Sequence, residues 1–284
     1  MPRKREVVAF QGEEGAFSQE AVRQMLGSAL KVLPCPRFED VFQALQRGQA
    51  TAGAVPIENT LHGSVHENYD LLLQYDLTIA AETKVRIVHN LIAAPGTTFA
   101  DVRYVRSHPV ALNQCLRFFS RNPQLERVPF YDTAGSVKAL MAERPPHSAA
   151  IASAVAAERY GGRILRRSIE DDRRNFTRFF LLRRREEAPP LRHRAREGKE
   201  WKTSLVFATR NTPGALFRCL SAFALRDLNM TKIESRPLRG RPWEYLFYLD
   251  FLGHVEDERC RNALNHLGEL ADLLRVLGCY PKGD

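Results

Sequence analysis

The sequence predicts an α/β protein with two domains, a larger one built on a mostly parallel sheet and a smaller one of β-α-β-β-α-β order. Three observations predict this organisation. The length of 284 residues is about twice that of a common domain. Apolar runs alternate with helical patterns up to residue 182, and the order changes after residue 203. Between them, residues 183–202 combine a Pro-Pro pair, dense charge and no apolar periodicity, which is typical of an exposed linker. We therefore expect domains at 1–182 and 203–284.

The first domain alternates strands with crossover helices. Phe38, Val41, Phe42 and Leu45 follow the i, i+3, i+4, i+7 spacing of a helix with one buried face. Strands interleaved with helices indicate a mostly parallel sheet, whose ligand site lies where loops leave the carboxyl ends of the strands. In chain order we expect strand 6–10, helix 16–27, strand 31–35, helix 38–47, strand 52–57, helix 64–75, an apolar stretch at 77–94, strand 103–106, helix 109–121, strand 126–131, helix 134–143, strand 149–152, helix 154–160 and strands 164–169 and 176–182.

The second domain has the element order of a ferredoxin-like domain. Thr212-Pro213 is a good N-cap followed by proline at the first helical position. A leucine stripe at 264, 267, 270, 274 and 277 predicts a long final helix. The sheet and the apolar helix faces suit pairing with a second copy of the chain. We expect strand 203–209, helix 213–226, strands 230–236 and 245–252, helix 256–277 and a short extended piece at 278–280.

The composition is that of a globular protein, with one unusual number. The chain is 44% hydrophobic and 26% charged, and its formal net charge is +9, which raises nucleic acid or anionic substrates as partners. Residues 3–5 contribute +3 and residues 183–202 contribute +4, leaving +2 for both folded domains. The basic excess therefore belongs to a tail and a linker. With no basic helix or helix-turn-helix pattern, no nucleic-acid partner is expected.

The five cysteines form no C-x-x-C pair and are widely spaced, so neither a zinc ribbon nor a disulfide framework is indicated. They are expected to be buried free thiols in a reducing compartment. The apolar run after Glu6 is too short for a signal peptide, so a cytoplasmic location is expected. The longest stretch without Asp, Glu, Lys or Arg is 14 residues, too short to span a bilayer.

Four polar clusters stand at predicted strand-to-helix junctions of the first domain. Ser, Thr, Asn and Gly are ordinary caps and turn formers, which is the preferred interpretation of any one cluster alone. Together they supply hydroxyls, amides and helix N-terminal N–H groups, which can hold a carboxylate. The clusters are 12–18, 56–64, 107–109 and 132–136.

A fifth cluster, Asn175 to Phe179, opens a strongly apolar predicted strand. A lone threonine in a strand usually reflects β propensity. Arg178 is harder to explain in this way, because an arginine that enters a buried strand needs an anionic partner.

Other kinds of site are poorly supported. His62 and His66 have i, i+4 spacing but no third ligand is indicated, so a metal site is not expected. Gly12 and Gly15 lack the further glycine or Lys-Ser/Thr of a nucleotide-binding loop. The G-x-S-x-G pattern of a hydrolase nucleophile is absent.

These motifs resemble those of the prephenate dehydratase family, which includes arogenate dehydratases. The family's P-x-E-N-S-x-x-G pattern is similar to residues 56–63, with Thr60 in place of the usual serine, and S-H-P-x-A-L-x-Q-C to residues 107–115. D-T-A-x-A-A is similar to residues 132–137, with Gly135-Ser136-Val137 in place of the usual small run, and N-x-T-R-F is found at 175–179. In the second domain, G-A-L at 214–216 and E-S-R-P at 234–237 resemble signatures of the ACT regulatory domain.

The resemblance implies a two-lobed catalytic domain, similar to periplasmic binding proteins, and a decarboxylating dehydration. Prephenate would lose its ring carboxylate as CO₂ and its 4-hydroxyl as water to give phenylpyruvate in phenylalanine biosynthesis. Aromatisation drives such a reaction, so no cofactor is implied. This agrees with the absence of cofactor motifs.

The resemblance also implies the site residues. Thr177 is the group that hydrogen-bonds or protonates the departing hydroxyl; since a threonine hydroxyl is a poor proton source, we expect it to position and relay. Arg178 is a candidate for a substrate carboxylate, although adjacent strand residues point to opposite faces, so it could instead be structural. The other implied substrate-binding residues are Glu58, Asn59, Thr60, Ser107, Gln114 and Thr133.

An ACT domain would bind phenylalanine and regulate the enzyme by coupling between two sites. The loop after Thr212-Pro213 stands at a predicted helix N-terminus and suits an amino-acid carboxylate. In the structural alternative, Gly214 only permits a close approach and Glu234 and Arg236 form a surface ion pair. The implied effector residues are Gly214, Ala215, Leu216, Asn229, Glu234, Ser235 and Arg236, and the expected assembly is a homodimer or homotetramer.

Alternatives of other kinds stay open at this point. Arogenate is an alternative substrate, because residues 66–71 resemble plant-type members. A binding protein of the periplasmic type would share the two-lobed architecture but not the ACT signatures. An amino-acid-sensing regulatory protein would use the ACT domain without the chemistry.

Overall fold

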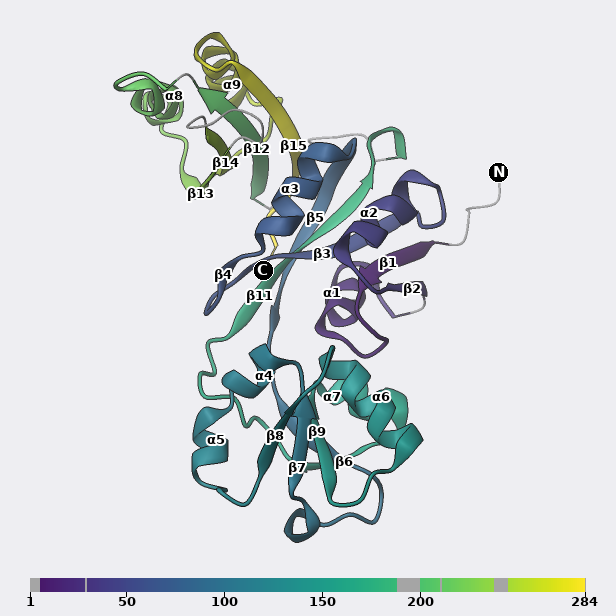
Figure 1. Ribbon diagram of the computed structural model, residues 1–284. Coiled ribbons are helices and arrows are strands. Elements are labelled where there is room, and N and C mark those ends of the chain that lie inside the picture. The colour runs from purple at the N-terminus through teal and green to yellow at the C-terminus, as the bar shows by residue number, and fades with distance from the viewer. Residues whose placement is uncertain (1–5, 29, 188–199, 210, 238–244, 284) are drawn as a thin grey trace. The chain divides into compact units, whose positions relative to one another are not determined.

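The computed structural model describes residues 6–28, 30–187, 200–209, 211–237 and 245–283 (Figure 1). It divides into two compact units, Met1–Tyr75 with Thr83–Leu181 and Asp76–Glu82 with Leu182–Asp284. The second unit thus takes a short segment from within the sequence of the first. The domain boundaries expected from the sequence do not include the assignment of this segment to the second unit.

The first lobe contains β1 (Val7–Gln11), α1 (Phe17–Leu26), β2 (Lys31–Cys35), α2 (Phe38–Gln46), β3 (Ala52–Asn59), β4 (Gly63–Ser64), α3 (His66–Gln74), β5 (Leu77–Arg86) and β11 (Phe176–Arg184). The part of β5 before Thr83 and the part of β11 after Leu181 are assigned to the second unit. Its sheet has the order β2-β1-β3-β11-β5, and β4 pairs with β3. β1 pairs in parallel with β2 and β3. The helix expected at 64–75 starts later, because Gly63 and Ser64 pair with the end of β3 instead.

The second lobe contains β6 (Asn90–Ala93), β7 (Tyr104–Ser107), α4 (Pro109–Asn113), α5 (Leu116–Ser120), β8 (Glu126–Pro129), α6 (Thr133–Glu143), β9 (Ser148–Ala152), α7 (Ala154–Tyr160) and β10 (Arg163–Arg166), with a short 3-10 helix at Phe99–Asp101. The sheet order is β10-β6-β9-β7-β8. β7 is parallel to β8 and β9, but β6 is antiparallel to β9 and β10. The predicted α/β class and the two lobes are therefore confirmed, and the parallel expectation fails at β6.

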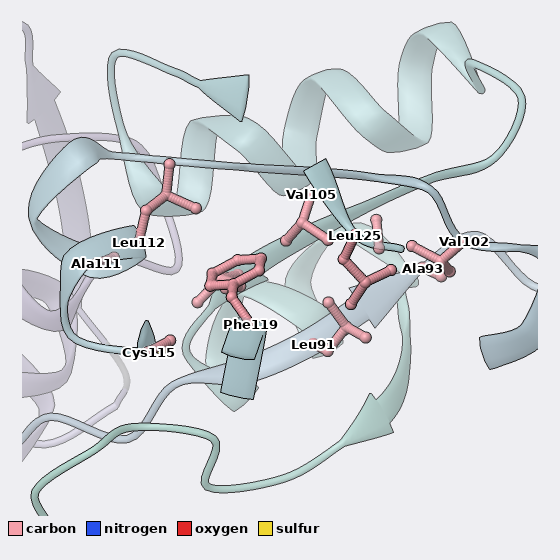
Figure 2. Packing of buried hydrophobic residues seen from close by; sticks show 11 residues of the cluster. Leu91, Ala93, Val102, Val105, Ala111, Leu112, Cys115, Phe119 and Leu125 are labelled. Atoms are coloured by element: carbon pink, nitrogen blue, oxygen red, sulfur yellow. The ribbon is translucent and has the colours of Figure 1, made fainter. Parts of the chain in front are cut away.

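The core of the second lobe fixes the α4–α5 region (Figure 2). Leu91 and Val105 of the sheet cluster with Leu112, Cys115 and Phe119 of the helical segment, and all five side chains are buried. The turn between the two helices, at Gln114 and Cys115, is therefore held in place.

The single helix expected at 109–121 is broken at Gln114 and Cys115. Asp171 explains the break, because its carboxylate accepts hydrogen bonds from Leu116 N at 2.8 Å and Arg117 N at 2.9 Å, capping α5. The Asp171 amide in turn donates to Gln114 O at 2.7 Å. A residue distant in sequence thus ends one helix and starts the next, which periodicity alone does not reveal.

The chain passes between the lobes in two segments. Residues 87–89 join β5 to β6, and residues 167–175 join β10 to β11. The two segments are tied together, since Ile87 N donates to Asn175 O at 2.8 Å and His89 N to the Glu170 carboxylate at 3.0 Å. Several predicted site residues lie on these crossings or beside them.

The second unit contains β12 (Trp201–Thr209), α8 (Ala215–Ala224), β13 (Met230–Pro237), β14 (Tyr245–Leu252), α9 (Glu258–Leu270) and β15 (Leu273–Pro281). Its antiparallel sheet has the order β13-β14-β12-β15. The predicted β-α-β-β-α-β order is confirmed. Phe207, Phe223, Phe251 and Leu267 form the centre of its core.

The last helix is shorter than predicted. The expected helix at 256–277 ends at Leu270, and Leu274 and Leu277 lie on β15. β15 pairs with β12 over its length, so the backbone groups of the last two leucines bond across a sheet. The leucine spacing fits a helix, but residues 273–281 form a strand because they pair with β12.

The predicted linker is shorter at both ends. β11 continues to Arg184, a 3-10 helix covers Arg185–Glu187, and β12 starts at Trp201; residues 188–199 lie outside the described residues, as do the basic residues 3–5. Lys202, expected in the linker, is instead a buried β12 residue whose ammonium lies 2.7 Å from the Glu82 carboxylate within the second unit.

All five cysteines are buried free thiols, as expected. In the part of the chain that the structure describes, no helix has both the length and the apolar character needed to cross a membrane.

Candidate active site

Asn59 connects the end of β3 to the start of β11. Its Nδ2 lies 2.8 Å from Asn175 Oδ1, 2.9 Å from Thr177 Oγ1 and 3.2 Å from Phe176 O. The other end of the amide is fixed, because Asn59 Oδ1 accepts from the backbone N–H groups of Leu61 and His62 at 2.9 and 3.0 Å. The E-N-T and N-x-T-R-F motifs, distant in sequence, are therefore joined through one side chain.

Thr60 strengthens the same junction. Its amide donates to Phe176 O at 2.9 Å, its hydroxyl donates to Arg174 O at 2.9 Å, and Phe176 N donates back to that hydroxyl at 3.0 Å. These bonds use the hydroxyl to hold β11, which explains why threonine serves in place of serine. Glu58, two residues before Thr60, is half-buried and pairs with Ser64 across the β3–β4 ladder.

Thr177 is buried, with 8% of its surface exposed. Its hydroxyl oxygen accepts from Asn59, so the single hydroxyl hydrogen stays available for another acceptor. Arg178, the next residue, is also buried, and its guanidinium lies 4.8 Å from the centre of the Phe180 ring. The two neighbours thus have different surroundings, as alternating strand residues do.

Gln114 stands at the break between α4 and α5, opposite His89. Gln114 Oε1 lies 2.7 Å from His89 Nε2, and both side chains are buried. The His89 ring packs edge-on against Phe17 at 5.8 Å between centroids. Burial lowers the pKa of His89, with the Gln114 hydrogen bond and Glu170 acting in the opposite direction. His89 is therefore a neutral imidazole that orients the Gln114 amide.

A pocket of about 160 Å³ lies beside these groups. One side comes from the loop after Asn59, one from the end of α4, and one from the crossing that leads into β11. The lining residues are Leu61, His62, Asn113, Gln114, Glu170, Asp171, Asp172 and Asn175.

The pocket's three carboxylates are already compensated. Glu170 pairs with Arg86 at 3.2 Å, Asp172 pairs with Arg174 at 3.2 Å, and Asp171 caps α5. Among the described residues, no three or more His, Cys, Asp or Glu side chains gather as a metal ion would require.

Two predicted residues lie at the carboxyl ends of second-lobe strands. Ser107, at the end of β7, is fully buried and donates to Ile151 O at 2.7 Å. Thr133 begins α6 after β8 and is half-buried. No hydrogen bond links either residue to the Asn59–Thr177 junction within the described residues.

The Gly12–Ala16 segment of the first lobe contacts the same edge of the second lobe. Ser153 Oγ donates to Gly15 O at 2.7 Å, and a Cβ on Gly15, whose φ is +90°, would lie 2.7 Å from Ala156 Cα. Asp132 caps α6 through Gly135 N at 2.7 Å and lies against Gly12; burial raises its pKa. This cluster therefore joins the lobes, a role compatible with its caps and glycines.

The sequence motifs do not include every residue that lines the pocket or contacts its lining. His89 lies in an apolar stretch and gives no local signal. The Glu170-Asp171-Asp172 run was available as a signal, but an acidic run usually lies on a solvated surface. Asn175 was recognised only as part of a motif.

In the second unit, the predicted effector residues occupy a helix start and a sheet edge. Gly214 has φ +74° and directly precedes α8, which begins with Ala215 and Leu216. Glu234, Ser235 and Arg236 lie on β13, an edge strand. Asn229 O accepts from Leu252 N at 2.9 Å. Glu234 Oε2 lies 3.7 Å from Lys232 Nζ.

Comparisons with known proteins define the class. The family model for prephenate dehydratase matches residues 8–187. Over 283 residues the chain is 42% identical to arogenate dehydratase/prephenate dehydratase 2, a chloroplastic protein of Arabidopsis thaliana, covering 96% of this chain and 72% of that protein.

Solved structures agree with the match. The prephenate dehydratase of Arthrobacter aurescens in complex with L-Phe is 32% identical, covers 97% of this chain and 89% of its own, and superposes with a TM-score of 0.86. GqqA, described as a novel type of quorum quenching acylase, is 35% identical over 98% of both chains with a TM-score of 0.88. The fold and these matches define a lyase of the dehydratase class. The chain belongs to the prephenate dehydratase family.

The buried His89 predicts a pH dependence of stability. Its pKa in the folded protein lies below the value of about 6.5 in an unfolded chain. Below that pH the unfolded chain binds a proton that the folded protein does not, so this contribution to stability is present above pH 6.5 and is lost as the pH falls. We expect His89→Gln to flatten the slope of unfolding free energy against pH between 7 and 5, measured by urea denaturation. His66→Gln, at an exposed position, serves as the control, and parallel curves for His89→Gln and wild type would contradict the assignment.

Proposed function

We propose that this protein is a prephenate dehydratase, with Thr177 as the group that meets the departing hydroxyl. The main support for this role is the hydrogen bond that Asn59 Nδ2 donates to Thr177 Oγ1 at 2.9 Å. Because that oxygen accepts from Asn59, its own hydrogen can be directed to the 4-hydroxyl of the substrate. As the ring carboxylate leaves as CO₂, the electron pair of the broken C–C bond enters the ring and the C4–O bond breaks. The hydrogen bond from Thr177 stabilises the leaving oxygen, which takes a proton from the solvent and departs as water.

Three of the remaining predicted residues take two different roles. Gln114 faces the pocket with an amide whose Oε1 is held by His89, so its Nε2 is free to donate to a substrate oxygen. Asn59 and Thr60 position the start of β11 through their hydrogen bonds. Glu58, Ser107, Thr133 and Arg178 remain proposals from the family motifs, and the burial of Arg178 over Phe180 also suits a structural role.

The likeness to GqqA raises acyl transfer as a second class of reaction. An acylase of the nucleophilic kind needs a hydroxyl or thiol activated by a base. Thr177 has no such base among its hydrogen-bond partners in the described residues, and burial raises the pKa of the Cys115 thiol. These observations favour the dehydratase.

The first test separates the substrates. Purified protein incubated with prephenate should release phenylpyruvate and CO₂. Incubated with arogenate, it should form phenylalanine at a lower rate than it forms phenylpyruvate from prephenate. Turnover of neither compound would contradict the proposed function, and faster turnover of arogenate would favour the alternative.

Thr177→Val should lower kcat for prephenate by roughly 10²–10⁴-fold, because a single positioned proton-transfer group contributes about that much. Valine keeps the shape, so thermal unfolding should change little. Thr83→Val is a matched control on β5, where the hydroxyl bonds only to Gln24 among the described residues. Near-normal turnover of folded Thr177→Val would remove Thr177 from the mechanism.

We propose further that the second unit is an ACT domain that binds phenylalanine and pairs with a second copy. The β-α-β-β-α-β order and the Gly214 turn before α8 support this. Exposed apolar side chains, Phe217 at 76% and Leu225 at 74%, are available for pairing. The relative from Arthrobacter aurescens is itself described in complex with L-Phe. Buried free thiols support a reducing, cytoplasmic location.

Phenylalanine should bind the full-length chain in calorimetry and change the rate of prephenate turnover. Gly214→Val should weaken this binding at least tenfold, because φ +74° strains any branched side chain and the loop before α8 would shift. Gly268→Ala, in the last turn of α9, serves as the control. Absence of binding and of any rate effect would contradict the regulatory assignment.

A further inference from the structure

Asn175 lines the pocket, and the roles proposed above for Thr177 and Gln114 do not involve its side-chain nitrogen. It directly precedes β11, two residues before Thr177, and its side chain is fully buried. The pocket also contains Gln114, whose amide is oriented by His89.

The orientation of the Asn175 amide follows from its neighbours. Asn59 Oδ1 accepts two backbone N–H bonds, from Leu61 and His62, so Asn59 Nδ2 is the atom that faces β11. That donor needs an acceptor, and Asn175 Oδ1 supplies it at 2.8 Å. The Nδ2 of Asn175 is consequently directed elsewhere.

This Nδ2 is buried and has no hydrogen-bond partner among the described residues. An unpaired buried donor is costly, and native proteins retain one chiefly where a ligand or an ordered water meets it. Beside a pocket of a dehydratase, a donor of this kind suits an oxygen of the substrate.

The charges of the pocket allow an anionic oxygen. Glu170 is neutralised by Arg86 and Asp172 by Arg174, while the Asp171 carboxylate is bound by the first N–H groups of α5. An incoming carboxylate therefore meets amide donors from Gln114 and Asn175 with no uncompensated negative charge from these three residues.

We propose that Asn175 binds a carboxylate or carbonyl oxygen of the substrate through its Nδ2; this inference rests on the proposed dehydratase function. The same Asn59 Nδ2 contacts both Asn175 Oδ1 and Thr177 Oγ1. Asn175 and Thr177 are thus neighbours, and in this proposal one small substrate meets both: the Thr177 hydroxyl at the departing hydroxyl and Asn175 Nδ2 at another oxygen.

Asn175→Asp tests the donor without disturbing its neighbour. Aspartate keeps an oxygen for Asn59 Nδ2, removes the N–H₂ donor and adds a negative charge that repels the substrate's oxygens at this position. We expect prephenate to bind roughly 10–100-fold more weakly, the range for a lost hydrogen bond to a charged group. The affinity is measured by calorimetry in the slow Thr177→Val background, and KM is measured in the otherwise wild-type chain.

Asn175→Leu is the comparison, since it removes both the donor and the acceptor for Asn59. If Asn175 only supports Asn59, Asn175→Leu is impaired and Asn175→Asp binds prephenate as wild type does, which would overturn the proposal. Weakened binding of both prephenate and arogenate supports a carboxylate contact, and weakened binding of prephenate alone supports a carbonyl contact. Retained prephenate affinity without any wild-type turnover would count against the dehydratase function and not against this contact.

Discussion

The Asn59 side chain is the interaction on which the candidate site depends. Its carbonyl oxygen is held by two backbone N–H groups of its own loop, which leaves the amide nitrogen directed at Asn175, Phe176 and Thr177. The planar Asn59 amide therefore fixes the Thr177 hydroxyl relative to the β3–β4 turn. An aspartate carboxylate at this place could accept from the loop but could not donate to the strand.

The second lobe contributes through its connections more than through its strands. Both crossings between the lobes pass the site, and they are bonded together by Ile87 with Asn175 and His89 with Glu170. The broken helix brings Gln114 to His89, and the same Asp171 that causes the break lines the pocket. The groups around the pocket are therefore held by the two segments that cross between the lobes.

Much of the fold could be predicted because its signals are local. The Phe38 to Leu45 stripe gives α2, and the order of elements after residue 200 gives the second unit. The failures come from long-range pairing. Leu274 and Leu277 keep helical spacing but pair with β12, and the break at Gln114 needs Asp171. For the candidate site, the motifs predict Asn59 and Thr177, whereas their direct contact and the roles proposed for His89 and Asn175 depend on three-dimensional proximity that spacing does not encode.

The central claim is that Asn59 acts on the reaction through Thr177. A double-mutant cycle on kcat with Asn59→Leu and Thr177→Val tests this most directly, with thermal unfolding to confirm that each variant is folded. The account predicts that Asn59→Leu slows the wild type by a large factor but slows the Thr177→Val variant far less, since the hydroxyl it positions is already gone. Equal factors in the two backgrounds would contradict the account, because the two residues would then contribute independently.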